Sequence, residues 1–318
     1  MGEQTKIEWC DHSWSPWRGC TNVSAGCANC YAEALADRFG PSWGGWGKGA
    51  PRIKAKNWND PRKWNKTDKT GFTVGDPPTT VFPSLCDWLD DEVPIEWLAE
   101  FLQLIHATPN LHWLLLTKRP ENWEKRISGV LDWIENLPEW QDDKPGLGIE
   151  ALRNWLADWN VLRRAPANVS IIVSVENQET ADRRIPDLLK IPSRIRGLSL
   201  EPLLGPVDID LWLGDVGGKR SGVVMGINWL IVGGESGNGA RPCNVEWIRS
   251  LVRQGKVSGV PVFVKQLGAR PKVASTIGHP DSAAAGWLKQ SHPKGGDPAE
   301  WPDDLRVREF PDWKGGAK

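Results

Sequence analysis

Short apolar runs rich in β-branched residues alternate with longer amphipathic stretches along most of this chain, and this alternation constrains the fold more than any other feature. Repeated β-α units of this kind build a parallel sheet with helices packed against it. Helices are predicted over Ile95 to His106 and Val245 to Gln254, and a first strand is predicted near Ile7 to Cys10. Six further strands are predicted: Val81 to Cys86, Leu111 to Thr117, Val169 to Glu176, Gly197 to Pro202, Trp229 to Gly234 and Val260 to Gln266.

Polar residues follow most of the predicted strands at the point where each strand ends. In a β/α barrel the carboxyl ends of the strands share one mouth, where the chemistry is housed. These side chains are therefore expected to share a site, although a single charged residue at a strand end is as often a solvated or structural ion-pair member. The residues are Lys118, Arg119, Glu176, Asn177, Glu201, Gly233, Gly234, Glu235 and Ser236, with Lys265 and Gln266 on the last strand.

The length of 318 residues fits one α/β domain with insertions. We predict a parallel β/α barrel domain over residues 1–270, interrupted by inserted lid segments at about 40–80 and 119–168. Residues 271–318 are predicted to be an irregular C-terminal extension.

The formal net charge of −1 argues against a protein that binds nucleic acid over its whole surface. One segment differs, because residues 48–69 carry eight basic and two acidic side chains, a local charge of +6. Basic groups interleaved with indoles suit a nucleic-acid groove, and a solvated loop is an equally good interpretation. The candidate substrate contacts are Lys54, Lys56, Arg62, Lys63, Trp58 and Trp64, together with Lys118 and Arg119.

No apolar run approaches the about 20 residues that span a bilayer, and the first residues lack the pattern of a secretory signal. A cytoplasmic location is therefore expected. In a reducing compartment, closely spaced cysteines indicate metal binding or catalysis rather than disulfides. The five histidines show no ligand spacing and are interpreted as surface or packing residues.

Cys20, Cys27 and Cys30 form a Cys-x6-Cys-x2-Cys motif on a glycine-containing loop before a predicted helix, Tyr31 to Phe39. Three thiolates can hold an iron–sulfur cluster and leave one iron open to a cofactor or substrate, which permits catalysis. Zinc is the alternative, with Cys10 or His12 as a fourth ligand. Cys86 and Cys243 are interpreted as small apolar side chains.

Several blocks in order resemble the phage-encoded three-cysteine-motif family, which is similar to radical S-adenosylmethionine (SAM) proteins. They extend from about residue 5 to about residue 268, and the first two cysteines are spaced more widely than in the usual radical SAM signature. The blocks are Thr5-Lys6-Ile7-Glu8-Trp9, Trp14-x2-Trp17-x-Gly19-Cys20, the cysteine motif, Ser174-Val175-Glu176-Asn177-Gln178, Glu201-Pro202-Leu203, Gly233-Gly234-Glu235-Ser236-Gly237, Ala240-Arg241-Pro242 and Val264-Lys265-Gln266-Leu267-Gly268.

The resemblance implies that the parallel β/α barrel is a partial one. It also implies a [4Fe-4S] cluster on Cys20, Cys27 and Cys30, SAM as cofactor, and flavodoxin or ferredoxin as electron donor. Reductive cleavage of SAM would yield a 5′-deoxyadenosyl radical. The phage connection suggests an isomerase or transferase that acts on a nucleobase adduct, such as a hypermodified thymidine, in viral DNA within the host cytoplasm. By the same resemblance, the expected SAM contacts are Glu176, Asn177, Glu201, Gly233, Gly234, Glu235, Ser236 and Arg241.

Two other interpretations stay open. A radical SAM enzyme could act on tRNA, a peptide or a small metabolite instead. A zinc-stabilised nucleic-acid-binding module would need neither SAM nor the strand-end polar groups.

Overall fold

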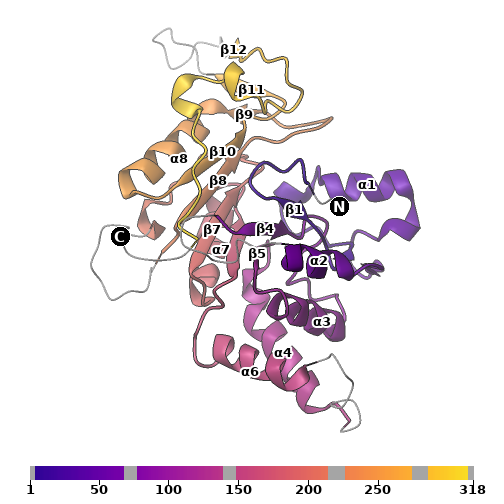
Figure 1. The fold of residues 1–318 in the computed structure, drawn as a ribbon. Helices are drawn as coiled ribbons and strands as arrows, with labels where there is room; N and C mark the ends of the chain where they lie inside the picture. Colours follow the sequence, from indigo (N-terminus) through magenta and orange to yellow (C-terminus); the bar gives the residue numbers. More distant parts are fainter. Residues whose placement is uncertain (1–3, 68–76, 139–147, 214–225, 274–285, 314–318) are drawn as a thin grey trace.

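A seven-stranded parallel sheet forms the centre of the protein in the computed structural model, which describes residues 4–67, 77–138, 148–213, 226–273 and 286–313. The sheet order β1-β4-β5-β6-β7-β8-β10 follows the chain, and the sheet curls into a half-barrel (Figure 1). This confirms a mixed α/β fold on a parallel sheet and is compatible with a partial β/α barrel. The strands are β1 His12–Ser13, β4 Thr79–Phe82, β5 Leu111–Thr117, β6 Val169–Ser174, β7 Ile195–Leu200, β8 Trp229–Gly233 and β10 Val262–Gln266.

Two small sheets lie beside the main one. An antiparallel pair joins β2 and β3, and β11 lies between β9 and β12. Their bounds are β2 Trp17–Arg18, β3 Ile53–Lys54, β9 Cys243–Asn244, β11 Pro271–Val273 and β12 Gly286–Trp287. The α-helices are α1 Tyr31–Phe39, α2 Asn59–Thr67, α3 Ile95–His106, α4 Trp123–Glu135, α6 Ile149–Asn160, α7 Gln178–Lys190 and α8 Val245–Ser258. Among these described elements, none is long and apolar enough to cross a membrane.

The two faces of the main sheet bury different cores, because successive side chains of a strand point to opposite faces. On β5, Trp113 and Leu115 belong to the larger core, which the helices cover. Leu114 belongs instead to a smaller aromatic core inside the half-barrel, together with Trp229 and Trp313. The interior below the strand ends is therefore filled with side chains, and the space for a site lies at the ends of the strands.

The prediction of a strand at Ile7 to Cys10 is wrong. A backbone hydrogen bond from Cys10 N to Ile7 O (3.2 Å) and another from Thr5 N to Asp11 O (3.0 Å) fold this stretch into a turn. The first strand follows it at His12–Ser13. The six later strands are present, with bounds that differ from the predicted ones by one to four residues except for β5, which matches.

The two inserted segments differ in position. The first segment contains β3 and α2. Part of it lies against the cysteine loop, because Gly45 O accepts a hydrogen bond from Cys20 N (3.3 Å). In the second, α4 and α6 pack on α3 in the helix layer (Figure 1). Their buried apolar stripes, which include Ile127 and Leu156, make α4 and α6 part of the helix layer. Residues 139–147 lie outside the described part.

Residues 307–309 of the C-terminal extension lie along the open edge of β10. Val264 N donates to Val307 O (2.8 Å), and Glu309 N donates to Val262 O (2.9 Å). Arg308 then forms an ion pair with Glu8 near the other end of the chain (3.1 Å). Most of the described residues of the extension lie outside helices and strands, and residues 307–309 cover the edge at which the sheet would otherwise end.

Candidate functional site

A cavity of about 150 Å³ lies at the carboxyl ends of β4, β5 and β6, and Cys20, Cys27 and Cys30 all line it. Cys27 is buried and the other two are partly buried. Lys118, Arg119 and Ser174 reach it from the ends of β5 and β6. The structure therefore gathers the cysteine motif and part of the strand-end polar set around one space.

Local backbone geometry holds the cysteine loop in place. The backbone of Cys20 pairs with that of Trp46 in an isolated parallel β-bridge. Residues Ala25–Cys27 form a short 3-10 helix. Cys30 is the N-cap residue of α1. Tyr31, the first residue of that helix, donates its hydroxyl hydrogen to Ser84 O beyond β4. The cysteine loop therefore continues directly into α1, and the hydrogen bond of Tyr31 holds the start of that helix against the end of β4.

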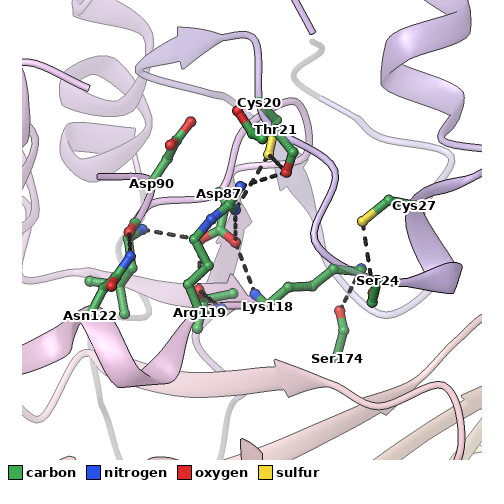
Figure 2. A network of polar contacts seen from close by, with 12 residues as sticks. Cys20, Thr21, Ser24, Cys27, Asp87, Asp90, Lys118, Arg119, Asn122 and Ser174 are labelled. Carbon is green, nitrogen blue, oxygen red and sulfur yellow. Dashed lines mark hydrogen bonds and ion pairs between the residues drawn. The ribbon is translucent and has the colours of Figure 1, made fainter. Parts of the chain in front are cut away.

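Arg119 connects the end of β5 to the first cysteine (Figure 2). Its guanidinium forms a 2.8 Å ion pair with Asp87 and donates to Thr21 O (2.5 Å) and to Cys20 Sγ (3.5 Å). Burial and the nearby Asp87 carboxylate raise the pKa of the Cys20 thiol to about 12, although Arg119 opposes this shift. A free Cys20 therefore stays protonated at neutral pH, and binding of a metal there would release a proton.

Glu176 ties the cysteine loop to the end of β6. Its fully buried carboxylate accepts a hydrogen bond from Ser24 Oγ (2.8 Å) and pairs with Arg184 (3.0 Å). Lys118 Nζ donates to Ser174 Oγ (3.0 Å) and lies 4.0 Å from Glu176 Oε1 (Figure 2 shows Lys118 extended toward Ser174). Lys118 is about one-fifth exposed, so it is more accessible from the cavity than Arg119 is.

A second tie comes from the residues after β8. Glu235 pairs with Arg241 and accepts a hydrogen bond from Asn29 Nδ2 (2.9 Å), and Arg241 Nη1 donates to Ala25 O (2.8 Å). Burial raises the pKa of Glu235, but the hydrogen bonds from Arg241 and Asn29 outweigh it and hold the pKa below its usual range. Glu235 and Arg241 thus contact the cysteine loop, in addition to each other.

The remaining residues predicted to contact the cofactor have structural contacts at the ends of helices and strands. Asn177 caps α7 by accepting from Thr180 N (3.0 Å), and Glu201 pairs with Lys265 (2.7 Å). Gly233 ends β8. A Cβ at Gly234 would lie 2.3 Å from Leu267 O, so this position requires glycine for packing. Ser236 is half-buried beside them.

The candidate substrate contacts of the basic segment, residues 48–69, differ in their exposure. Lys54 forms an ion pair with Glu100 and lies 5.4 Å from the ring of the half-buried Trp58. Trp64 is 8% exposed and stacks on His12 at 4.2 Å, so the prediction that its ring is open to a base is wrong in this arrangement. Lys56, Arg62 and Lys63 are exposed. Lys69 lies outside the described residues.

The helix that carries two of these exposed cations lies toward the amino end of β5. Asn65 on α2 accepts a hydrogen bond from the backbone of Asn110, the residue before β5 (2.9 Å). The cavity lies beyond Thr117 at the other end of the strand. Arg62 and Lys63 therefore do not share the immediate surroundings of the cysteines.

Two residues of the site were not predicted from the sequence. Cys86 lines the same cavity, although it was interpreted as a small apolar side chain. Asp87 is buried and accepts hydrogen bonds from Thr117 Oγ1 (2.6 Å) and Lys118 N (2.9 Å) as well as pairing with Arg119. Both follow β4, so applying the strand-end rule to that strand would have identified them.

Three thiols around one cavity are compatible with the ligand set that an iron–sulfur cluster needs. Among the described residues, no group of three or more His, Cys, Asp or Glu side chains is arranged to hold one metal ion. In a cluster, separate irons take separate thiolates, so the sulfurs need only face one space. Cys10 and His12, the possible fourth zinc ligands, line a different hollow. The fit rests on three thiols and one shared cavity.

A protein family described as "Protein of unknown function (DUF5131)" matches residues 4–293. The chain belongs to this family. Comparisons with curated proteins and with solved structures give no match. The matched region of this DUF5131 protein includes the cysteine loop, all seven strands of the main sheet and both ties to the loop.

Proposed function

We propose that this protein is a radical SAM enzyme in which Cys20, Cys27 and Cys30 bind a [4Fe-4S] cluster. The observation that carries the proposal is that the three thiols line one cavity at the carboxyl ends of parallel strands. When bound, such a cluster supplies the electron for cleavage of SAM at its open iron. Flavodoxin or ferredoxin is the proposed reductant.

The polar groups around the cavity have roles that suit this chemistry. Glu176 and Glu235 orient the loop that carries the ligands, since each contacts it through a charged hydrogen bond. Lys118, the more exposed cation, can bind the carboxylate of SAM or a phosphate of the substrate. The filled interior below the site excludes water from beneath it.

Anaerobic reconstitution with iron and sulfide tests this proposal. The full chain should take up about four irons, in line with a cluster of this type, and form 5′-deoxyadenosine from SAM and dithionite. Cys27→Ala should abolish both. Cys243→Ala is the matched control, because Cys243 is buried in β9 and lies outside the cavity lining. A colourless protein with one zinc would instead favour a binding module.

The proposed substrate is a base of DNA, as an isomerase or transferase acting on a thymidine adduct would require. The exposed Lys56, Arg62 and Lys63 support binding of a polyanion, because each can neutralise a phosphate. The position of Arg62 and Lys63 away from the cavity would suit contacts to the DNA backbone outside the reacting base. A base would have to be extruded from the duplex to enter the cavity.

Oligonucleotide binding measured over a range of salt concentrations tests the substrate class. Removing Lys56, Arg62 and Lys63 should weaken binding and reduce the salt slope by about 1 for each phosphate that is no longer neutralised. A control that removes the exposed Lys125, Arg253 and Lys256 on α4 and α8 changes the net charge equally. Equal weakening in both variants would contradict a DNA site at this segment and direct the search to tRNA, peptides or metabolites.

A further inference from the structure

Arg119 differs from the other cations near the cysteine loop because it contacts a sulfur. Its Nη1 lies 3.5 Å from Cys20 Sγ, and the side chain is almost fully buried. The contact to Cys27 is of another kind, since the neutral hydroxyl of Ser24 lies 3.9 Å from its sulfur. Within the described residues, Cys20 is the one thiol of the motif with a cationic donor at hydrogen-bond distance.

Several hydrogen bonds fix the guanidinium of Arg119, so the surrounding structure sets its orientation toward Cys20. The Asp87 carboxylate binds the same Nη1, and Thr21 O accepts from Nη2 (2.5 Å). Asp87 is itself held by Thr117 Oγ1 and by the backbone N–H of Lys118. A charged donor in such a buried network keeps its orientation and is weakly screened by solvent.

A fixed positive charge beside one sulfur has a definite effect on a cluster. Reduction adds one negative charge to the cluster and its ligands, and hydrogen bonds to the sulfurs help set its potential. A cationic donor stabilises the reduced state more than the oxidised state. We infer that Arg119 is a positioning residue that raises the reduction potential of a cluster bound through Cys20. This inference rests on the proposed function.

Arg52 provides a matched control. It is also buried, pairs with Asp90 at 2.8 Å and donates from Nη2 to Thr21 Oγ1 (2.8 Å). Arg52 thus supports the same loop residue as Arg119 through a similar ion pair, but it donates to oxygen atoms rather than to a sulfur. A change that merely loosened the loop should affect both arginines alike.

The experiment is an EPR-monitored redox titration of the reconstituted full-length protein, with iron determined for each sample. Two variants are used, Arg119→Lys and the double variant Arg119→Gln/Asp87→Asn, which leaves no unpaired buried charge. Both should retain the cluster. The double variant removes the cationic donor and should show a more negative midpoint potential than the wild type, and Arg119→Lys, which keeps the charge but loses the Nη1 contact to Cys20 Sγ, should show a smaller shift in the same direction. Arg52→Lys should leave the midpoint unchanged.

The outcomes separate the two proposals. An unchanged midpoint with full iron content in both Arg119 variants would overturn the tuning role and leave the proposed function standing. An equal shift in Arg52→Lys would overturn it too, because the effect would come from the loop. If both Arg119 variants lost the cluster while Arg52→Lys and the wild type kept it, Arg119 would be needed for cluster binding, and the tuning role would be overturned. A wild-type protein without a cluster would overturn the proposed function itself, and the inference with it.

Discussion

Gly26 lies so close to the buried carboxylate of Glu176 that a Cβ on the glycine would come within 2.4 Å of Glu176 Oε1. The glycine belongs to the turn just before Cys27, and the glutamate lies just beyond the end of β6. Because Arg184 and Ser24 also hold the carboxylate, it has little room to move. The cysteine loop can therefore approach the sheet this closely only with glycine at position 26.

Gly26→Ala should displace the cysteine loop and destabilise the protein by about 1–3 kcal/mol, the usual cost of overpacking. Urea unfolding measures the loss, and iron uptake after reconstitution should fall with it. Gly205→Ala is the control, since its added Cβ would lie an ordinary 3.5 Å from Asn177 Cβ. Equal stability of the two variants would contradict the close contact.

Glu176→Gln should be strongly destabilising because it leaves the Arg184 guanidinium, which is 1% exposed, without its countercharge. Removal of one partner from a buried ion pair costs about 3–5 kcal/mol. Chemical denaturation at neutral pH should show this loss. The exposed Glu179, three residues along the chain, gives the comparison, and Glu179→Gln should change stability by less than about 0.5 kcal/mol.

The strands and helices were predictable where the local pattern alone decides them. The run from Leu111 to Thr117 and the helix from Ile95 to His106 have the predicted bounds, because turn residues flank clear apolar periodicity. The turn at Ile7 to Cys10 was not predictable in this way. Its short apolar run resembles a strand, and only backbone contacts with its neighbours show otherwise.

The candidate site was predictable in its location but less so in the contacts of its members. The rule that polar groups end parallel strands brought Glu176 and Lys118 to the same edge as the cysteines. The partners of the carboxylates come from distant parts of the chain. Asn29 lies 206 residues before Glu235, and no local pattern connects them.

His112 should make the protein less stable in mild acid. Burial inside the half-barrel lowers its pKa to about 3, whereas the unfolded chain takes up this proton near the ordinary value of about 6.5. Stability from the neutral imidazole is thus complete above that value and is lost as pH falls toward 3, at up to about 1.4 kcal/mol per pH unit.

Urea unfolding at pH 7 and pH 5 measures this effect. His112→Gln should flatten the pH dependence between these values, at some cost in stability at pH 7. The same change at the exposed His292 is the control and should leave the dependence as in the wild type. A His112 variant with an unaltered pH dependence would contradict the buried neutral form.

Trp313 closes the interior of the half-barrel from the C-terminal extension. Its ring lies 5.5 Å from that of Trp229 and 4.9 Å from that of His112, and it is 7% exposed. Trp313→Ala should therefore destabilise the protein by about 3–5 kcal/mol, the cost of removing a buried aromatic ring. Phe310→Ala should cost much less, because Phe310 is 47% exposed. If thermal and urea unfolding found Trp313→Ala as stable as the wild type, the extension would not contribute to the stability of the aromatic core. A large loss would mean that a barrel cut after residue 270 lacks part of its own interior, since the other residues of that aromatic core come from the N-terminal turn and the strands.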